Sequence, residues 1–125
     1  MLTVRKHGTR MFMNPGGKPE LGETPAETLL RELGEELGLK LGVEQLEYLG
    51  CFNAAAANEA DHTVSAEVFR VANTHLDPHP AAEIAEFRWL SAAAATELGP
   101  SLAPLIAEHF AHLLPHDTPA AHPPV

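Results

Sequence analysis

The clearest pattern of apolar and polar positions lies between Thr24 and Gly38 and predicts an amphipathic helix. Apolar residues recur there three or four positions apart, as one face of a helix requires; they are Leu29, Leu30, Leu33 and Leu37. Thr24 suits the N-cap, Pro25 the first helical position, and Glu27 completes a capping box. Gly38 can end the helix in the left-handed conformation. The pattern therefore specifies both ends of the helix as well as its buried face.

Extended segments surround this helix. Residues rich in β-branched and aromatic side chains predict strands at 2–6, 44–52, 62–71 and 86–90, with a short extended piece at 11–13. Ser91 is placed to cap a short helical turn, and Ser101 to cap a final helix reaching Leu114. Strands on both sides of an amphipathic helix predict an α/β fold, namely an α/β/α sandwich around a mixed β-sheet.

Length and composition fit a single domain. The chain has 125 residues with an ordinary apolar share, which is enough for one hydrophobic core. We expect residues 1–114 to form the domain and the Pro- and Ala-rich residues 115–125 to be a disordered tail. No segment is apolar and long enough to span a membrane. The single cysteine, Cys51, is expected to be a buried thiol in a reducing cytoplasm.

The charge of the chain narrows the choice of partner. The formal net charge is −9, with only eight Lys and Arg residues, which argues against nucleic acid and against an anionic membrane. A small molecule carrying phosphate would need a positive group between itself and the protein. A divalent cation is the natural candidate for that group.

Three glutamates on the predicted helix carry the candidate chemistry. Glu32, Glu35 and Glu36 fall within an arc of roughly 100° beside the leucine face. Like-charged helical pairs cost a few tenths of a kcal/mol each, and Gly34 in mid-helix costs about 1 kcal/mol more. Stability alone therefore disfavours the arrangement, whereas Mg²⁺ or Mn²⁺ takes hard oxygen ligands of this kind. The alternative for such a charge run, taken alone, is an ordinary solvated face.

The wider motif decides between these alternatives. It runs Gly, five residues, Glu, seven residues, Arg-Glu, an apolar residue, any residue, Glu-Glu, any residue, Gly and an apolar residue. Its fixed positions are Gly17, Glu23, Arg31, Glu32, Leu33, Glu35, Glu36, Gly38 and Leu39. This motif resembles the Nudix box, and a chance match somewhere in the chain is of the order of 10⁻⁸ to 10⁻⁷. The resemblance implies the Nudix fold, here without the further strand that family members usually carry before residues 2–6.

The resemblance also implies an activity and a set of roles. Nudix hydrolases use Mg²⁺, for which Mn²⁺ can substitute, to cut a phosphoanhydride bond in a nucleoside diphosphate derivative. The implied metal ligands are the Gly16 carbonyl, Glu32, Glu35 and Glu36. Arg31 would hold these carboxylates through charge-assisted hydrogen bonds, a geometry that Lys cannot reproduce. Glu23 would support the junction between loop and helix or bind a second metal ion.

The substrate is the most open part of the interpretation. Arg5, Lys6 and Lys18 are candidates to contact phosphate, and exposed surface cations are the equal alternative. A (deoxy)nucleoside triphosphate or an oxidised nucleotide is the preferred substrate, and ADP-ribose is the alternative. A non-catalytic nucleotide-sensing module is the rival from another functional class. Self-association as a homodimer stays open.

The general base is expected outside the helix, because carboxylates bound to a metal are poor proton acceptors. The loop before the last predicted strand offers Glu83 and Glu86. Glu86 is expected to begin the strand, whereas Glu83 lies on a segment free to swing over a bound diphosphate. Glu83 is therefore the candidate base, with Glu32 as the alternative and a solvated surface acid as the competing interpretation of Glu83.

Overall fold

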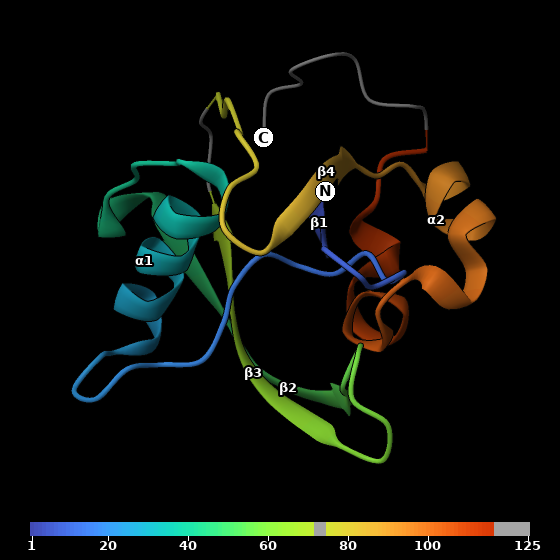
Figure 1. The fold of residues 1–125 in the computed structure, drawn as a ribbon, viewed down its shortest axis with the longest axis horizontal. Helices are drawn as coiled ribbons and strands as arrows, with labels where there is room; N and C mark the ends of the chain where they lie inside the picture. Colours follow the sequence, from blue (N-terminus) through green and yellow to red (C-terminus); the bar gives the residue numbers. More distant parts are fainter. Residues whose placement is uncertain (72–74, 117–125) are drawn as a thin grey trace.

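Figure 1 shows the computed structural model of the chain, which describes residues 1–71 and 75–116. Its elements follow in the order β1 (Leu2–Lys6), α1 (Pro25–Leu37), the 3₁₀ turn η1 (Val43–Gln45), β2 (Leu46–Ala55), β3 (Thr63–Val71), β4 (Ile84–Trp89) and α2 (Ala92–Leu98). Three short helical pieces end the described chain: η2 (Gly99–Ser101), the π-helical η3 (Ile106–Phe110) and η4 (Ala111–Leu113). Most of the expected tail, residues 117–125, lies outside the described residues.

The strands form two antiparallel pairs, β1 with β4 and β2 with β3. The first pair runs from Leu2 opposite Trp89, with a register shift between Arg5 and Lys6. Parallel pairing within the described residues is limited to one isolated bridge, between Phe12 and Leu102. The predicted α/β class is confirmed, and the strands of the expected mixed sheet occur as two small antiparallel sheets. Figure 1 shows α1 and α2 on opposite sides of the strands.

Helix α1 begins and ends at the predicted residues. The Thr24 hydroxyl accepts from the Glu27 N–H at 3.2 Å, and the Glu27 carboxylate accepts from the Thr24 N–H at 2.9 Å. These reciprocal bonds are the predicted capping box. Gly38 follows the helix with a φ of +65°, and its N–H donates to the Gly34 carbonyl.

The apolar face of α1 is buried against the β1–β4 pair. The main core cluster consists of Val4, Leu33, Leu37, Leu39, Leu76 and Ile84. Trp89 packs against this cluster while partly buried. A second cluster lies under α2 and comprises Leu90, Ala95, Leu102, Ile106 and Leu114. Because Leu33 and Leu37 are buried in the main cluster, the position of α1, and of the polar residues beside these leucines, is fixed by core packing.

The C-terminal part differs from the prediction. Ser101 does not cap a helix but lies in η2, where its carbonyl accepts from the Phe12 N–H at 2.8 Å. Helical backbone starts at Pro104, which lacks an N–H and suits a first helical position. The bridge between Phe12 and Leu102 keeps Leu102 in an extended conformation, so a helix cannot run on from Ser101.

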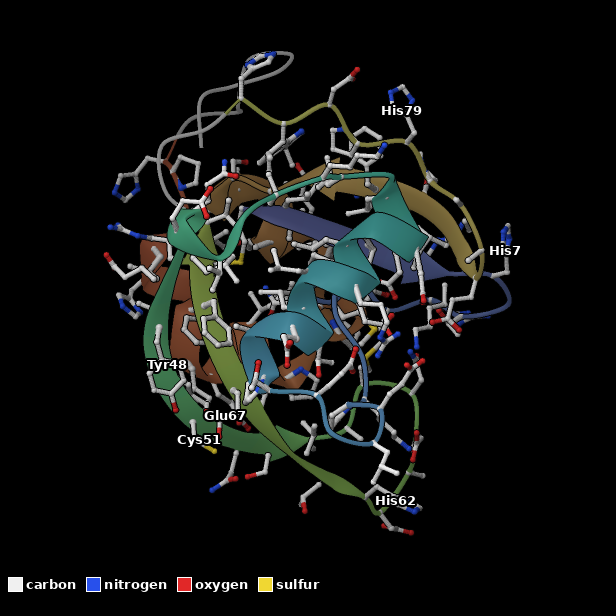
Figure 2. All side chains as sticks on the ribbon, turned by 90° about the vertical axis from the view of Figure 1, so that its left-hand side faces the viewer. His7, Tyr48, Cys51, His62, Glu67 and His79 are labelled. Atoms are coloured by element: carbon white, nitrogen blue, oxygen red, sulfur yellow. The ribbon has the colours of Figure 1, made fainter. Side chains whose placement is uncertain are left out.

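Two further expectations are corrected in the strands. Strand β4 begins at Ile84, so that Glu86 lies within it rather than at its start. Cys51 is exposed, not buried; Figure 2 shows it on the outer face of the β2–β3 hairpin with Tyr48 and Glu67. The local sequence was apolar, but no element packs on that face within the described part of the chain. In that same part, no helix is long and apolar enough to cross a membrane.

Candidate metal centre

Three carboxylates from two parts of the chain meet beside α1. One oxygen each from Glu32, Glu36 and Glu83 lies within 4.8 Å of the others. Glu32 and Glu36 share a helix face because they are four positions apart. Glu35 is outside this cluster, and its side chain is 54% exposed. Because successive residues turn by 100° around a helix, Glu36 faces the core while Glu35 faces solvent.

The loop before β4 brings Glu83 to the helix. The His79 N–H donates to the Leu37 carbonyl at 2.8 Å, and the Ala81 N–H donates to the Glu36 carbonyl at 2.9 Å. The last carbonyls of a helix have no partner within it, so this loop satisfies them. The Glu83 carbonyl in turn accepts from the His7 N–H at 2.9 Å, at the end of β1. Glu83 is therefore fastened on both sides, unlike the freely swinging segment that we expected.

Glu36 is the most buried of the three, at 2% exposed. Its Oε1 accepts from the Gly16 N–H at 3.1 Å, whereas its Oε2 is buried with no hydrogen-bond partner among the described residues. Burial raises the pKa of Glu36 to about 7; the Gly16 hydrogen bond opposes this shift, and the negative charge of Glu32 adds to it. A buried, unpaired carboxylate oxygen is costly unless a cation or a proton compensates it.

The glycines before the helix let the backbone lie against these carboxylates. A Cβ on Gly17 would lie 2.6 Å from the carboxyl carbon of Glu32, closer than real contacts allow. Gly16 has a φ of +147°, a conformation that other residues rarely adopt. The structure thus explains Gly16 by its backbone conformation and by the N–H that it donates to Glu36, and Gly17 by its close approach to the Glu32 carboxylate.

Arg31 joins the loop to the helix. Its Nε donates to Glu23 Oε2 at 2.6 Å and its Nη2 to Glu23 Oε1 at 3.1 Å, a two-pronged bond. Its Nη1 donates to Glu32 at 2.8 Å and to Glu35 at 3.3 Å. Its Nη2 also donates to the Lys18 carbonyl at 3.0 Å. The planar fork of guanidinium suits this set of bonds. Two of the expected partners, Glu32 and Glu35, are in it, and Glu23 takes the place of the expected Glu36.

Glu23 is held more firmly than its sequence position suggests. Hydrogen bonds from Arg31 lower the pKa of Glu23 to about 2, and bonds from the Glu20 N–H and the Thr28 hydroxyl contribute. Thr28 is buried at 5% exposed and was not predicted as a site residue. Its place on the helix, four residues after the N-cap and beside leucines, was the available signal.

The three cations predicted to contact phosphate differ in their distance from the carboxylate cluster. Lys6 Nζ lies 3.3 Å from Glu83 Oε1, next to the cluster. Arg5 Nε lies 3.0 Å from Glu86 Oε1, directly opposite across the β1–β4 pair. The Lys18 side chain is exposed. Of these three cations, Lys6 is therefore the one that contacts the carboxylate cluster, whereas Arg5 is bound to Glu86 of β4.

The residues present fit a divalent cation. The cluster offers hard carboxylate oxygens, one of them buried and unpaired, and a Cβ on Gly17 would displace the Glu32 carboxylate from its place in the cluster. Such oxygen donors match Mg²⁺ and Mn²⁺ rather than softer metals. Glu32 and Glu36 are the residues best placed to hold the ion.

Comparisons with known proteins bear on the family and the fold of the chain. The family model described as the NUDIX domain matches residues 1–112. A MutT/nudix family protein from Enterococcus faecalis has a similar structure, with a TM-score of 0.60 and 21% identity over 70% of this chain and 35% of that one. A protein from Chromobacterium violaceum, assigned provisionally to the nudix hydrolase family, gives a TM-score of 0.50 and 23% identity over 73% of this chain and 54% of that one. The chain thus spans about a third and about half of these two proteins. The comparison with curated proteins gave no match.

Removing the charge of Glu36 should stabilise the metal-free protein at alkaline pH. The folded pKa of about 7 lies above the ordinary 4.5, so Glu36 favours folding below pH 4.5 and this contribution is lost as pH rises to 7. We expect Glu36→Gln to abolish that slope and to raise the free energy of unfolding at pH 8 by up to about 3 kcal/mol. Urea unfolding in EDTA between pH 4.5 and 8 measures the free energy of unfolding of wild type and Glu36→Gln. The variant of the exposed Glu35, Glu35→Gln, is the matched control. Parallel pH profiles for wild type and Glu36→Gln would contradict the expectation.

Proposed function

The chain is a member of the Nudix family, and from that premise we propose that it hydrolyses a phosphoanhydride bond in a nucleoside diphosphate derivative with the aid of Mg²⁺. The observation that carries the proposal is the meeting of Glu32, Glu36 and Glu83 within 4.8 Å, with a buried, unpaired oxygen on Glu36. A module that only senses a nucleotide has no need of such a costly carboxylate cluster. The cluster therefore favours catalysis over the binding-only alternative.

The protein residues divide the work of binding and orientation. Glu32 and Glu36 would hold the cation, with the Gly16 carbonyl and Glu35 completing the set implied by the box. When bound, the cation supplies charge neutralisation for the diphosphate and lowers the pKa of a water molecule. Arg31 fixes Glu32 at 2.8 Å and ties it to the loop through Glu23. Mn²⁺ is expected to substitute for Mg²⁺ because it takes the same oxygen ligands.

We assign the role of general base to Glu83. Its side chain is 56% exposed, whereas that of Glu32 is 13% exposed, so Glu83 is the more accessible to an attacking water. The Lys6 ammonium lies 3.3 Å from Glu83 Oε1 and helps to hold this side chain beside the cluster. Glu32 stays the alternative base. In this proposal Glu83 acts from a fixed position, because its backbone is bound to the end of β1.

For the substrate, we propose a (deoxy)nucleoside triphosphate or its oxidised form, with ADP-ribose as the second candidate. Arg31 and Arg5 are already bound to carboxylates. Few protein cations are thus left for phosphate near the cluster, and the metal would offset most of the substrate's charge.

A nucleotide screen tests the activity. The chain is incubated with Mg²⁺ and with ADP-ribose, NADH, nucleoside triphosphates and oxidised nucleotides. Release of phosphate or pyrophosphate is measured for the triphosphates, and release of AMP is measured for ADP-ribose and NADH. We expect turnover of at least one compound, loss of turnover in EDTA, and a fall of at least about 10²-fold in Glu36→Gln. The exposed Glu97 on α2 provides a matched control, Glu97→Gln. No turnover of any compound by folded protein would refute the enzyme, and near-normal turnover by Glu36→Gln would refute the metal assignment.

A second substitution tests the base. Glu83→Gln keeps the size of the side chain but removes its proton acceptor, so kcat should fall by roughly 10²- to 10⁴-fold. The affinity for Mg²⁺ should change little, and the acidic limb of the pH–rate profile should be altered. Glu86→Gln is the matched control, because Glu86 bonds to Arg5 instead of joining the cluster. Wild-type kcat in Glu83→Gln would return the role to Glu32.

A further inference from the structure

The side chain of Asn14 has hydrogen-bonding capacity that the described part of the chain does not use. Its Oδ1 is buried with no hydrogen-bond partner among the described residues, as is Oε2 of Glu36. Its Nδ2 donates to the Met1 sulfur at 3.7 Å, and a thioether is a weak acceptor. A buried polar atom without a partner costs free energy. The cation that Glu36 would bind accounts for one of these two oxygens, and the oxygen of Asn14 needs another explanation.

The backbone on both sides of Asn14 is held next to the metal centre. Met13 and Val4 exchange two hydrogen bonds, of 2.8 and 2.9 Å. Pro15 follows Asn14 and disfavours a helical conformation for the residue before it. Gly16, whose N–H binds a carboxylate of the cluster at 3.1 Å, is two residues away, so its Cα lies within about 7 Å of that of Asn14. Asn14 therefore presents an amide from a fixed backbone beside the carboxylates.

Asn14 lines a cavity of about 1170 Å³ that adjoins the metal centre. The walls include Gly16, Gly17 and Glu23, which contact the carboxylates or Arg31. Much of the remaining wall is apolar, with Leu2, Leu29, Leu33, Phe69, Trp89 and Phe110 among its residues. Mainly apolar cavities with a few polar groups are typical of sites that bind and orient a small organic molecule.

Several other polar side chains of the cavity wall already have partners within the chain. These pairs are Ser65 with Asn53, Glu67 with Tyr48, Arg70 with Glu47, and Thr28 with Glu23. Figure 2 shows Glu67 and Tyr48 together on the outside of the hairpin. Asn14 differs from these residues because its carboxamide has both a donor and an acceptor left for a ligand.

We propose that the cavity takes the base of the nucleotide substrate and that Asn14 pairs with the edge of this base, an inference that rests on the function proposed above. A carboxamide donates and accepts side by side, as in its two-point pairing with N6 and N7 of adenine. A nucleobase has apolar faces for the apolar walls and a polar edge for the amide. Asn14 is thus a residue that determines specificity for the base, whereas the carboxylates act on the phosphates.

The surroundings of Asn14 allow this exchange of partners. The terminal torsion of asparagine is soft, and the methionine side chain against its amide is flexible, so the amide can turn from the Met1 sulfur to a base. The amide has already lost its water through burial. Pairing with a base therefore adds hydrogen bonds without a further cost of removing water from Asn14.

Binding of nucleosides tests this role without metal and without turnover. Adenosine, guanosine, cytidine and uridine are each titrated into the full chain in EDTA and followed by NMR. We expect saturable binding of at least one nucleoside, with a shift of the Asn14 side-chain amide signals. The affinity should be at least about tenfold lower in Asn14→Leu and within about twofold of wild type in the matched control Asn53→Leu. Asn53 lies on β2, where it accepts from Ser65 and does not line the cavity.

Leucine is close to asparagine in shape and removes the buried unpaired oxygen, so the urea midpoint of Asn14→Leu should not fall. If this variant does not fold, the Asn14 amide signals of the wild type decide the matter. Absence of nucleoside binding, unchanged Asn14 signals on binding, or equal affinities in the two variants would overturn the proposal.

Turnover separates the role of Asn14 from the hydrolysis itself. The best triphosphate of the nucleotide screen is compared with ribose 5-triphosphate, which keeps the phosphates and lacks the base. In Asn14→Leu, kcat/KM should fall at least about tenfold for the nucleotide and stay within about twofold for the base-free compound. An equal fall for both compounds, or no fall for either, would overturn the role of Asn14 and leave hydrolysis standing. No turnover by the wild type would refute hydrolysis, and the nucleoside titrations would still decide the role of Asn14.

Discussion

The site depends on one guanidinium group. Arg31 holds Glu23 with two hydrogen bonds, and Glu32 and the Lys18 carbonyl with one each. In doing so it fixes the loop after the glycines against α1 and offsets the charge of two carboxylates. A lysine has no fixed fork with which to make these bonds together. Because Arg31 is hydrogen-bonded to these groups, it does not pair with Glu36, and the negative charge of Glu36 requires another cation.

The end of α1 couples the fold to the site in a second way. The carbonyls of Glu36 and Leu37 need partners because the helix stops at Gly38, and the N–H groups of Ala81 and His79 supply them. The same bonds carry Glu83 to the cluster. Local stability and the position of the third carboxylate are therefore achieved by one set of contacts. Within the cluster, the buried and unpaired oxygen of Glu36 is the unfavourable contact that remains.

The rest of the molecule is packed unevenly around this support. The elements that hold the carboxylates, β1, β4 and α1, share the main core cluster. The β2–β3 hairpin has one buried residue, Ala54, and a large cavity along its edge. The carboxylate cluster is thus built on the well-packed part of the fold, and the hairpin is the less buried part.

The sequence by itself determined what depends on residues a few positions apart. The capping box at Thr24 and the stop at Gly38 both arise within one helix and the residues next to it. The two bonds from Arg31 to Glu23, in contrast, were found only in the structure. Helical spacing also places Glu32 and Glu36 on one face. Only the tertiary structure decided which groups arrive from elsewhere. It brought Glu83 into the cluster, left Glu35 outside, held Arg5 on Glu86 and exposed Cys51. The reason is that local hydrogen bonds and helix periodicity are written in neighbouring residues, whereas the burial of a side chain depends on elements far along the chain that pack, or do not pack, against it.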